Sequence, residues 1–365
     1  MYSRLRPLLF RLDPEAAHGL AFAAARAGQA LTPGVLARTF AFEHMRLAQT
    51  LFGRTFENPV GLAAGMDKNA RYTELWSALG FGFVEVGSVT ARPSKGNPRP
   101  RLFRLPEDAA LVNRLGLNNE GAFRVGARLR ALRRGRLVVG VNIAKTHDPR
   151  ILGEAALEDF RRTFEAVAPS AAFVTLNVSC PNTREGKTFE EPRALDTLLG
   201  VIMEARRKRG LLTPVLVKFS PPLTARVVFD SLYDEAVAVG ETHGVAGYVA
   251  TNTASDRDGV SASPARLDAV GAGGLSGAPL EARATQLVRY LYGRTDGKKL
   301  IIGVGGVDSA EAAYRKIRAG ASLVELYTGL VYHGPGLVRE IKQGLLRLLD
   351  ADRLGHVSAA VGLDA

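Results

Sequence analysis

Cysteine is almost absent from this sequence, since Cys180 is the only one among 365 residues. A single thiol excludes an internal disulfide, so the fold does not depend on an oxidising compartment. Long apolar runs are missing too, because no stretch approaches the ~18 residues that a membrane-spanning helix needs. The apolar stretch 7–10 is short and acidic residues follow it, which argues against a secretory signal. These absences predict a protein that is soluble or lies on a membrane surface.

Acidic residues are fewer than basic ones, 36 against 48, which gives a formal net charge of +12. A basic chain suits an anionic partner, which can be nucleic acid, anionic lipid or an acidic substrate. Aromatic residues make up only 7% of the chain, and none is interleaved with the arginines of 128–136 to stack on bases. We therefore expect no nucleic-acid partner.

A Gly-x-Gly-x-x-Gly dinucleotide motif is also missing after the first strand-like run. Eight short apolar or β-branched runs recur, mostly separated by segments of helix length: 59–63, 82–86, 137–141, 172–176, 215–217, 247–250, 300–302 and 323–326. Such alternation is typical of parallel strands with crossover helices. Eight units favour an α/β fold of the (β/α)₈ TIM-barrel class over an open doubly wound sheet, which usually has fewer strands and an early phosphate loop.

Three segments stand outside this repeat. The proline-rich insertion from Thr90 to about Glu120 is expected to be a lid or pocket wall, and 256–274 a second, mobile loop.

In the N-terminal segment, Asp13-Pro14 predicts a helix start, Gly28 a stop, and Thr32-Pro33 a second short helix. This basic, amphipathic pair favours a membrane-surface element or a lid over an apolar pocket, with a plug for the barrel bottom as the alternative. We divide the chain into an extension (1–47), a barrel (48–350) and a tail (351–365).

Polar residues follow all eight runs, at the edge where barrel enzymes hold their reactive groups. They include Lys68, Ser88, Asn142, Asn177 with Cys180 and Asn182, Lys218, Thr251 to Thr253, Gly305-Gly306 and Tyr327-Thr328. Glycine backbone N–H groups after the last two runs suit a phosphorylated ligand. Lys218 would stabilise a ring that gains negative charge, as a reduced flavin does. Amides offer both donors and acceptors to a planar ligand, and Lys68 offers a cation to its carboxylate.

Several motifs together resemble the dihydroorotate dehydrogenase family, from residue 1 to about 348. They are Leu-Ala-Ala-Gly-Met-Asp-Lys at 62–68, Arg-Pro-Arg-Leu-Phe-Arg at 99–104, Asn113-Arg114 with Asn118, Asn-Val-Ser-Cys-Pro-Asn-Thr at 177–183, Thr-Asn-Thr at 251–253, Gly-Gly-Leu-Ser-Gly at 273–277, Ile-Gly-Val-Gly-Gly at 302–306, and Gly-Ala-Ser-Leu-Val at 320–324 with Tyr327. The N-terminal helix pair is similar to that of the membrane-associated, quinone-reducing class (class 2), in which it forms a quinone tunnel. The resemblance implies an FMN-bearing barrel that oxidises (S)-dihydroorotate to orotate in pyrimidine biosynthesis and reduces a membrane quinone. It also implies peripheral attachment to the cytoplasmic side of a bacterial cell membrane, without an iron–sulfur partner subunit.

The resemblance also implies roles for individual residues. Cys180 would be the catalytic base, at a position that is typically serine in the quinone-reducing class and cysteine in the soluble classes. The substrate-binding residues would be Lys68, Asn113, Arg114, Leu115, Gly116, Leu117, Asn177, Asn182, Asn252 and Thr253. The FMN-binding residues would be Ala64, Gly65, Ser88, Asn142, Asn177, Lys218, Thr251, Ser276, Gly277, Gly306, Tyr327 and Thr328. No metal site is expected.

Three alternatives remain open at this point. The first is a soluble-class dihydroorotate dehydrogenase that uses fumarate or NAD, which Cys180 favours and residues 1–47 oppose. The second is a non-redox barrel that binds phosphate, such as an isomerase. The third is a flavin-binding module at the membrane that has no catalytic activity. The preferred electron acceptor distinguishes the first alternative from the quinone-reducing enzyme. Bound flavin would exclude the second alternative, and turnover of dihydroorotate would exclude the third.

Overall fold

Eight parallel strands form a closed barrel in the computed structural model, which describes residues 2–31, 34–132, 135, 137–179, 188–222 and 231–365. Around the barrel the strands follow the order β10-β12-β13-β3-β4-β7-β8-β9. Their bounds are β3 (Val60–Leu62), β4 (Phe83–Val89), β7 (Val138–Ile143), β8 (Val174–Asn177), β9 (Val215–Phe219), β10 (Gly247–Ala250), β12 (Leu300–Val304) and β13 (Leu323–Leu326). Each of the eight runs contributes one strand, so the predicted (β/α)₈ barrel is confirmed.

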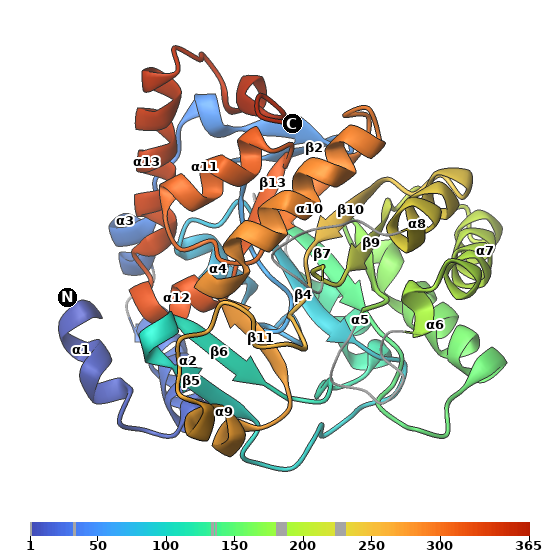
Figure 1. Cartoon of the computed structure of the whole chain (residues 1–365), viewed down its shortest axis with the longest axis horizontal. Helices are drawn as coiled ribbons and strands as arrows, with labels where there is room; N and C mark the ends of the chain where they lie inside the picture. Colours follow the sequence, from blue (N-terminus) through green and yellow to red (C-terminus); the bar gives the residue numbers. More distant parts are fainter. Residues whose placement is uncertain (1, 32–33, 133–134, 136, 180–187, 223–230) are drawn as a thin grey trace.

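Helices surround the barrel (Figure 1). They are α4 (Thr73–Ala78), α5 (Ala122–Ala131), α6 (Gly153–Val167), α7 (Pro192–Lys208), α8 (Ser231–Thr242), α10 (Glu281–Arg294), α11 (Ala310–Arg318), α12 (Thr328–His333) and α13 (Leu337–Ala351). A further helix, α9 (Pro264–Val270), packs against the proline-rich insertion instead. In α13 the buried Leu337, Ile341 and Leu345 recur at four-residue spacing, which places them on one face of the helix. The other helices with an apolar stripe bury it in the same way, and so close the barrel from outside.

Aromatic side chains fill the N-terminal end of the barrel. The buried rings of Phe83 and Phe173 lie 6.3 Å apart between centroids. Glycine makes room for them, because a Cβ at Gly61 would lie 2.2 Å from the Phe83 ring. The hairpin β1 (Gln49–Leu51) and β2 (Arg54–Phe56) closes this end, with Phe56 packed on Phe83 at 5.6 Å. The N-terminal end of the barrel is therefore filled by packed side chains, and only the C-terminal end leaves room for a ligand.

The proline-rich insertion is not an irregular loop. It forms β5 (Leu102–Leu105) and β6 (Ala110–Asn113), which join β11 (Gly274–Gly277) in an antiparallel sheet of order β11-β6-β5. The segment 256–274, expected as a loop, contains α9 and leads into β11. The two insertions thus meet in one small sheet beside the mouth of the barrel, as Figure 1 shows.

Three helices begin the chain: α1 (Tyr2–Leu9), α2 (Pro14–Leu31) and α3 (Val35–Phe40). The predicted start at Asp13-Pro14 is confirmed, because Asp13 accepts hydrogen bonds from the backbone N–H groups of residues 15 and 16. The predicted stop at Gly28 is wrong. Its φ is not positive, and α2 continues past it to Leu31, while the left-handed conformation occurs at Gly34, directly before α3, where φ is 86°.

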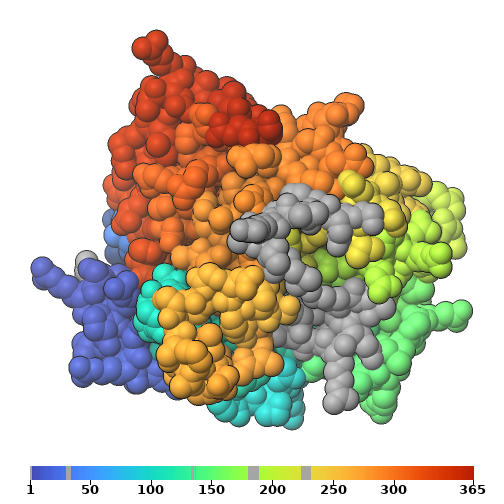
Figure 2. Space-filling view, in the orientation of Figure 1, coloured from blue at the N-terminus to red at the C-terminus, as the bar shows by residue number. Residues whose placement is uncertain are grey.

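The N-terminal helices rest on the small sheet and on α12 (Figure 2). The Tyr2 hydroxyl donates to the Val331 carbonyl over 2.5 Å, and Arg101 on the insertion pairs with Glu15 over 3.0 Å. Within the described part of the chain, no helix combines the length and the apolar character needed to cross a membrane.

Candidate active site

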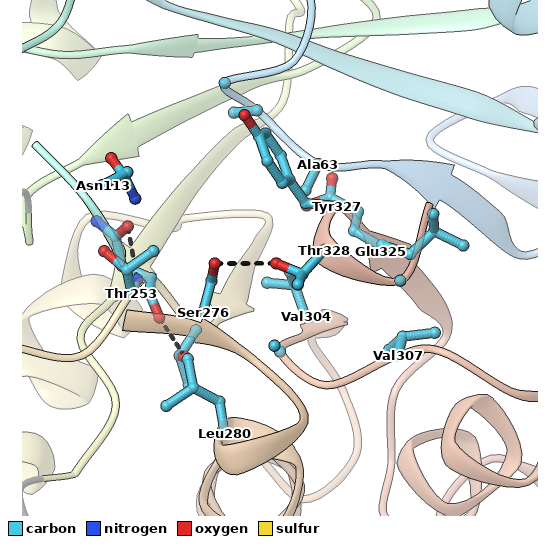
Figure 3. A pocket seen from close by; sticks show the side chains of 18 of the residues that line it. Ala63, Asn113, Thr253, Ser276, Leu280, Val304, Val307, Glu325, Tyr327 and Thr328 are labelled. Carbon is cyan, nitrogen blue, oxygen red and sulfur yellow. Dashed lines mark hydrogen bonds between the residues drawn. The ribbon is translucent and has the colours of Figure 1, made fainter. Parts of the chain in front are cut away.

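A cavity opens at the C-terminal end of the barrel, between the strand ends and the small sheet (Figure 3). Its lining contains most of the residues that the sequence predicts for a ligand site: Ala64, Gly65, Lys68, Ser88, Asn113, Leu115, Gly116, Leu117, Asn177, Lys218, Thr251, Asn252, Thr253, Ser276, Gly277, Gly306, Tyr327 and Thr328. Arg114 and Asn142 are not part of this lining. Cys180, Asn182 and Thr183 lie outside the described residues.

Hydrogen bonds link the amides on one wall of the cavity. Asn252 Nδ2 donates to Asn177 Oδ1 over 3.0 Å, and Asn177 Nδ2 donates to Ser88 Oγ over 3.1 Å. The Ser88 hydroxyl in turn donates to Asn142 Oδ1, which places Asn142 one residue behind the cavity wall. Neighbouring strands supply these side chains, and their mutual bonds fix which edge of each amide is presented. The wall is thus preorganised for a ligand with its own donors and acceptors.

Two cationic side chains reach the cavity from different strand ends. Lys218 Nζ on β9 is buried and lies 3.8 Å from Glu85 Oε1 on β4. Glu85 also accepts hydrogen bonds from Asn142 Nδ2 over 2.7 Å and from Thr175 Oγ1 over 2.8 Å, so its oxygens have the partners of a carboxylate. The ammonium of Lys218 therefore pairs with Glu85 inside the barrel and also lines the cavity.

Lys68 follows β3 and donates from Nζ to the Gly65 carbonyl over 2.6 Å. An ammonium has three donors, so this bond leaves donors for a ligand. Burial, and to a lesser degree the charge of Arg101, lowers the pKa of Lys68 to about 8, although Glu15 and Asp67 act in the opposite direction. A bound carboxylate would favour the charged form of this amine. Lys68 is therefore suited to bind an anionic group at near-neutral pH.

Glycines and hydroxyls form the wall opposite the amides. Gly305 and Gly306 have φ angles of 117° and 70°, and a Cβ at Gly306 would lie 2.5 Å from Cβ of Glu281. Only glycine fits there, and it exposes the backbone to a ligand. Ser276 and Thr328 hydrogen-bond through their hydroxyls at 2.9 Å (Figure 3). A wall of bare backbone and hydroxyl groups fits a phosphate.

Arg114 points away from the cavity. Its guanidinium donates to the carbonyls of Val270 (2.6 Å) and Ala272 (2.7 Å) and lies 4.4 Å from the centroid of the Phe103 ring. In this arrangement it holds the end of α9 against the small sheet, beside the cavity-lining residues Leu115 and Gly116. Its side chain thus supports the wall from behind.

A second cavity, of about 320 Å³, lies between the N-terminal helices and the barrel. Its lining is mostly apolar and comes from α1, α2, α3, α4, the small sheet and the start of α12. Small residues on α2, such as Ala17, Ala21 and Ala24, leave the space open. Tyr327 lines this cavity and also the one at the barrel mouth, and among the described residues no other does. Its side chain is therefore the shared wall of the two cavities.

Polar side chains that line the second cavity include those of His18 and Arg104. Burial, together with the charge of Lys68, lowers the pKa of His18 to about 4, so the imidazole is neutral near pH 7. Arg104 on β5 donates to the Leu12 carbonyl over 2.9 Å and lies over the Phe10 ring, 4.6 Å from its centroid. An apolar cavity with polar side chains in its lining suits a flat ligand that carries carbonyl groups.

Sequence reasoning missed several residues of the site. Glu85 and Glu325 lie inside apolar strand runs, where a carboxyl group is itself a signal of function or pairing, since charged groups are almost never fully buried alone. His18 carried no such signal, because a lone histidine on an amphipathic helix resembles any surface residue.

The fold and the site define an enzyme built on a (β/α)₈ barrel, with a ligand cavity at the carboxyl ends of its strands and a second, apolar cavity beside it. Residues 46–349 match the family model described as dihydroorotate dehydrogenase. The chain belongs to the dihydroorotate dehydrogenase family.

Relatives match along the whole chain. Proteins named dihydroorotate dehydrogenase (quinone) from Roseiflexus castenholzii and Natronomonas pharaonis are both 46% identical, covering 100% of this chain and 97% and 99% of theirs. One from Nocardia farcinica is 42% identical, covering 100% and 97%. The solved structure of dihydroorotate dehydrogenase from Eimeria tenella in complex with ferulenol has a TM-score of 0.85 at 34% identity and covers 96% of both chains. The ligand-free structure from that organism has a TM-score of 0.82, also at 34% identity.

Proposed function

We infer that the protein oxidises dihydroorotate to orotate in pyrimidine biosynthesis and passes the electrons to a quinone. One observation carries this inference: Tyr327 is the shared wall of a polar cavity at the barrel mouth and an apolar cavity under the N-terminal helices. A polar substrate and an apolar electron acceptor can then reach one cofactor from two sides, through separate cavities. The full-length relatives, which are named for the quinone-dependent reaction, support it.

FMN is the cofactor that we assign to the mouth cavity. When bound, it supplies the acceptor for the hydride and returns the electrons to the quinone. The residues that would hold it fit a flat, phosphorylated group: Ser276, Gly277, Gly306 and Thr328 at the phosphate, Ala64, Gly65, Ser88, Asn142, Asn177 and Thr251 along the ring, and Tyr327 at its edge. Lys218 contributes a buried cation, which stabilises negative charge on the ring.

Dihydroorotate is assigned to the same cavity. Lys68 offers its ammonium to the carboxylate, and Asn113, Asn177 and Asn252 offer donors and acceptors to the pyrimidine amides. Leu115, Gly116, Leu117 and Thr253 shape the remaining wall, with Asn182 and Arg114 as further candidates. Cys180, outside the described residues, is proposed as the base that takes the C5 proton. A thiol is partly ionised near neutral pH, which suits that task.

The quinone is assigned to the cavity under the N-terminal helices, with its carbonyl groups toward His18 and Arg104. Exposed leucines at 5, 8, 12 and 20 accompany arginines at 4, 6, 11 and 26, which suits peripheral attachment to an anionic membrane on the cytoplasmic side. Under this proposal 1–47 is a quinone- and membrane-associating extension, 48–350 the FMN barrel and 351–365 a tail. No iron–sulfur subunit takes part.

The experiment offers dihydroorotate to the purified protein with a quinone, fumarate or NAD as the acceptor, side by side. The proposal predicts a flavin-containing protein whose turnover is supported by the quinone far better than by the other two. Turnover with fumarate or NAD alone would assign the protein to a soluble class instead. A colourless protein without flavin would exclude all three reactions.

A further inference from the structure

Glu325 is a fully buried carboxyl group at the mouth of the barrel. It lies on β13, has no solvent exposure, and lines the mouth cavity, where Figure 3 draws it on the same strand end as Tyr327 and Thr328. Neither of its side-chain oxygens has a hydrogen-bond partner among the described residues. A carboxylate buried in this way is very unfavourable, whereas a neutral carboxylic acid costs far less.

The charges that act on Glu325 come from across the barrel, namely from Glu85 on β4 and Lys218 on β9. The cluster therefore holds two carboxyl groups and one ammonium. Glu85 has the ammonium at 3.8 Å and two hydrogen-bond donors, whereas Glu325 has neither among the described residues. The other described titratable residues that line the cavity are not among the charges that act on Glu325: Lys68, Asp308, Tyr327, Tyr332 and His333.

Such an unequal distribution of partners makes the two carboxyl groups ionise differently. Burial raises the pKa of Glu325 well above its usual range and the charge of Glu85 raises it further, while Lys218 lowers it. Two donors and the ammonium contact Glu85, and such contacts stabilise the charged form of a carboxyl group. With Glu325 neutral, at most one carboxylate opposes the ammonium of Lys218.

We propose that Glu325 is a positioning residue that remains a neutral carboxylic acid in the working enzyme. Lys218 then faces a single carboxylate, and its positive charge can stabilise negative charge on the cofactor. An ionised Glu325 would place a second anion at the base of the cavity and disfavour the anionic reduced cofactor. The inference rests on the proposed function insofar as the cofactor that Lys218 faces is a flavin.

The first test is the infrared spectrum of the purified, flavin-loaded protein, recorded in H₂O and D₂O. The proposal predicts a carbonyl band of a protonated carboxylic acid at pH 7 in the wild type. The band should be absent from Glu325→Gln and present in the control Glu340→Gln, which removes an exposed carboxyl group on α13. Should Glu325→Gln fail to fold, Glu325→Asp assigns the band by displacing it. A wild-type spectrum without such a band at pH 7 would overturn the proposal.

The second test is the midpoint potential of the bound flavin. Gln is a neutral isostere of protonated Glu, so Glu325→Gln should leave the ratio of reduced to oxidised flavin affinity within about threefold of wild type at pH 7. If Glu325 were ionised, the substitution would remove a negative charge and favour reduced flavin by about tenfold or more, or about 30 mV for a two-electron couple. That rise would refute the neutral acid while leaving the proposed reaction intact. Absence of bound flavin would refute the proposed function but would not remove the infrared band.

Discussion

Substitution of Lys218 by Met separates two roles that we propose for its ammonium, pairing with Glu85 and stabilisation of a reduced cofactor. At 3.8 Å from Glu85 and an effective dielectric constant of about 20, the attraction within this buried pair is about 4 kcal/mol. Lys218→Met keeps the length of the side chain but leaves Glu85 as an unpaired buried anion. We therefore expect a loss of about 3–5 kcal/mol in the free energy of unfolding, the usual cost of removing one partner of such a pair.

The second role is electrostatic stabilisation of the reduced cofactor. Removal of one preorganised charge or donor from a transition state typically lowers the rate by about 10²–10³. Glu85→Gln in the Lys218→Met background removes the stranded anion and should restore most of the stability. The added substitution restores no positive charge, so flavin reduction should stay at least about a hundredfold slow in the double variant.

Two measurements on the same samples test this separation: thermal or denaturant unfolding for stability, and anaerobic stopped-flow absorbance for flavin reduction by dihydroorotate. Glu85→Gln alone, which keeps the ammonium, is the matched control. If Lys218→Met/Glu85→Gln reduces its flavin as fast as wild type, Lys218 acts only by holding the barrel together, and its assignment to the cofactor is wrong.

Three further predictions follow from the same site. Because the pKa of Lys68 is about 8 and its cationic form is the one proposed to bind the substrate, kcat/KM for dihydroorotate should fall about tenfold for each pH unit above 8, and Lys68→Met should lack this limb of the pH profile. Cys180→Ala should slow flavin reduction by about 10²–10⁴ at unchanged flavin content, while Cys180→Ser keeps part of the rate and needs a higher pH; equal rates in all three proteins at every pH would exclude this thiol as the base. The pKa of Glu325 is raised in the folded state, so the stability of the wild type falls as pH rises from the ordinary glutamate range toward that raised value. The free energy of unfolding of Glu325→Gln, relative to that of the wild type, should therefore rise by up to about 1.4 kcal/mol per pH unit across that window. A difference in unfolding free energy that does not change with pH would contradict the raised pKa.

The sequence predicted the barrel because each strand is a short apolar run, and a parallel barrel brings the end of every run to one mouth. Residues directly after a strand, such as Lys68 and Asn252, could therefore be assigned to one cavity without coordinates. The cluster of Glu85, Glu325 and Lys218 could not, because it depends on which side chains the closed barrel brings together from β4, β9 and β13. The dual position of Tyr327 was equally hidden, since it requires the packing of α2 against the small sheet. The predicted end of the helix at Gly28 was wrong because glycine favours a helix end where the backbone adopts the left-handed conformation, and Gly28 does not adopt it.

The central claim is that substrate and quinone reach one cofactor from two separate cavities, and Ala21→Trp tests it most directly. Ala21 lines the cavity under the N-terminal helices, whereas Ala23, exposed on the same helix, does not line it, so Ala23→Trp is the matched control. Stopped-flow absorbance follows flavin reduction by dihydroorotate and then reoxidation by a long-chain quinone. The account predicts unchanged reduction in both variants and reoxidation at least about tenfold slower in Ala21→Trp alone, because the indole ring would occupy part of the cavity proposed for the quinone, and each loss of about 1.4 kcal/mol of binding is tenfold in affinity. Reoxidation of Ala21→Trp at the wild-type rate would contradict the account.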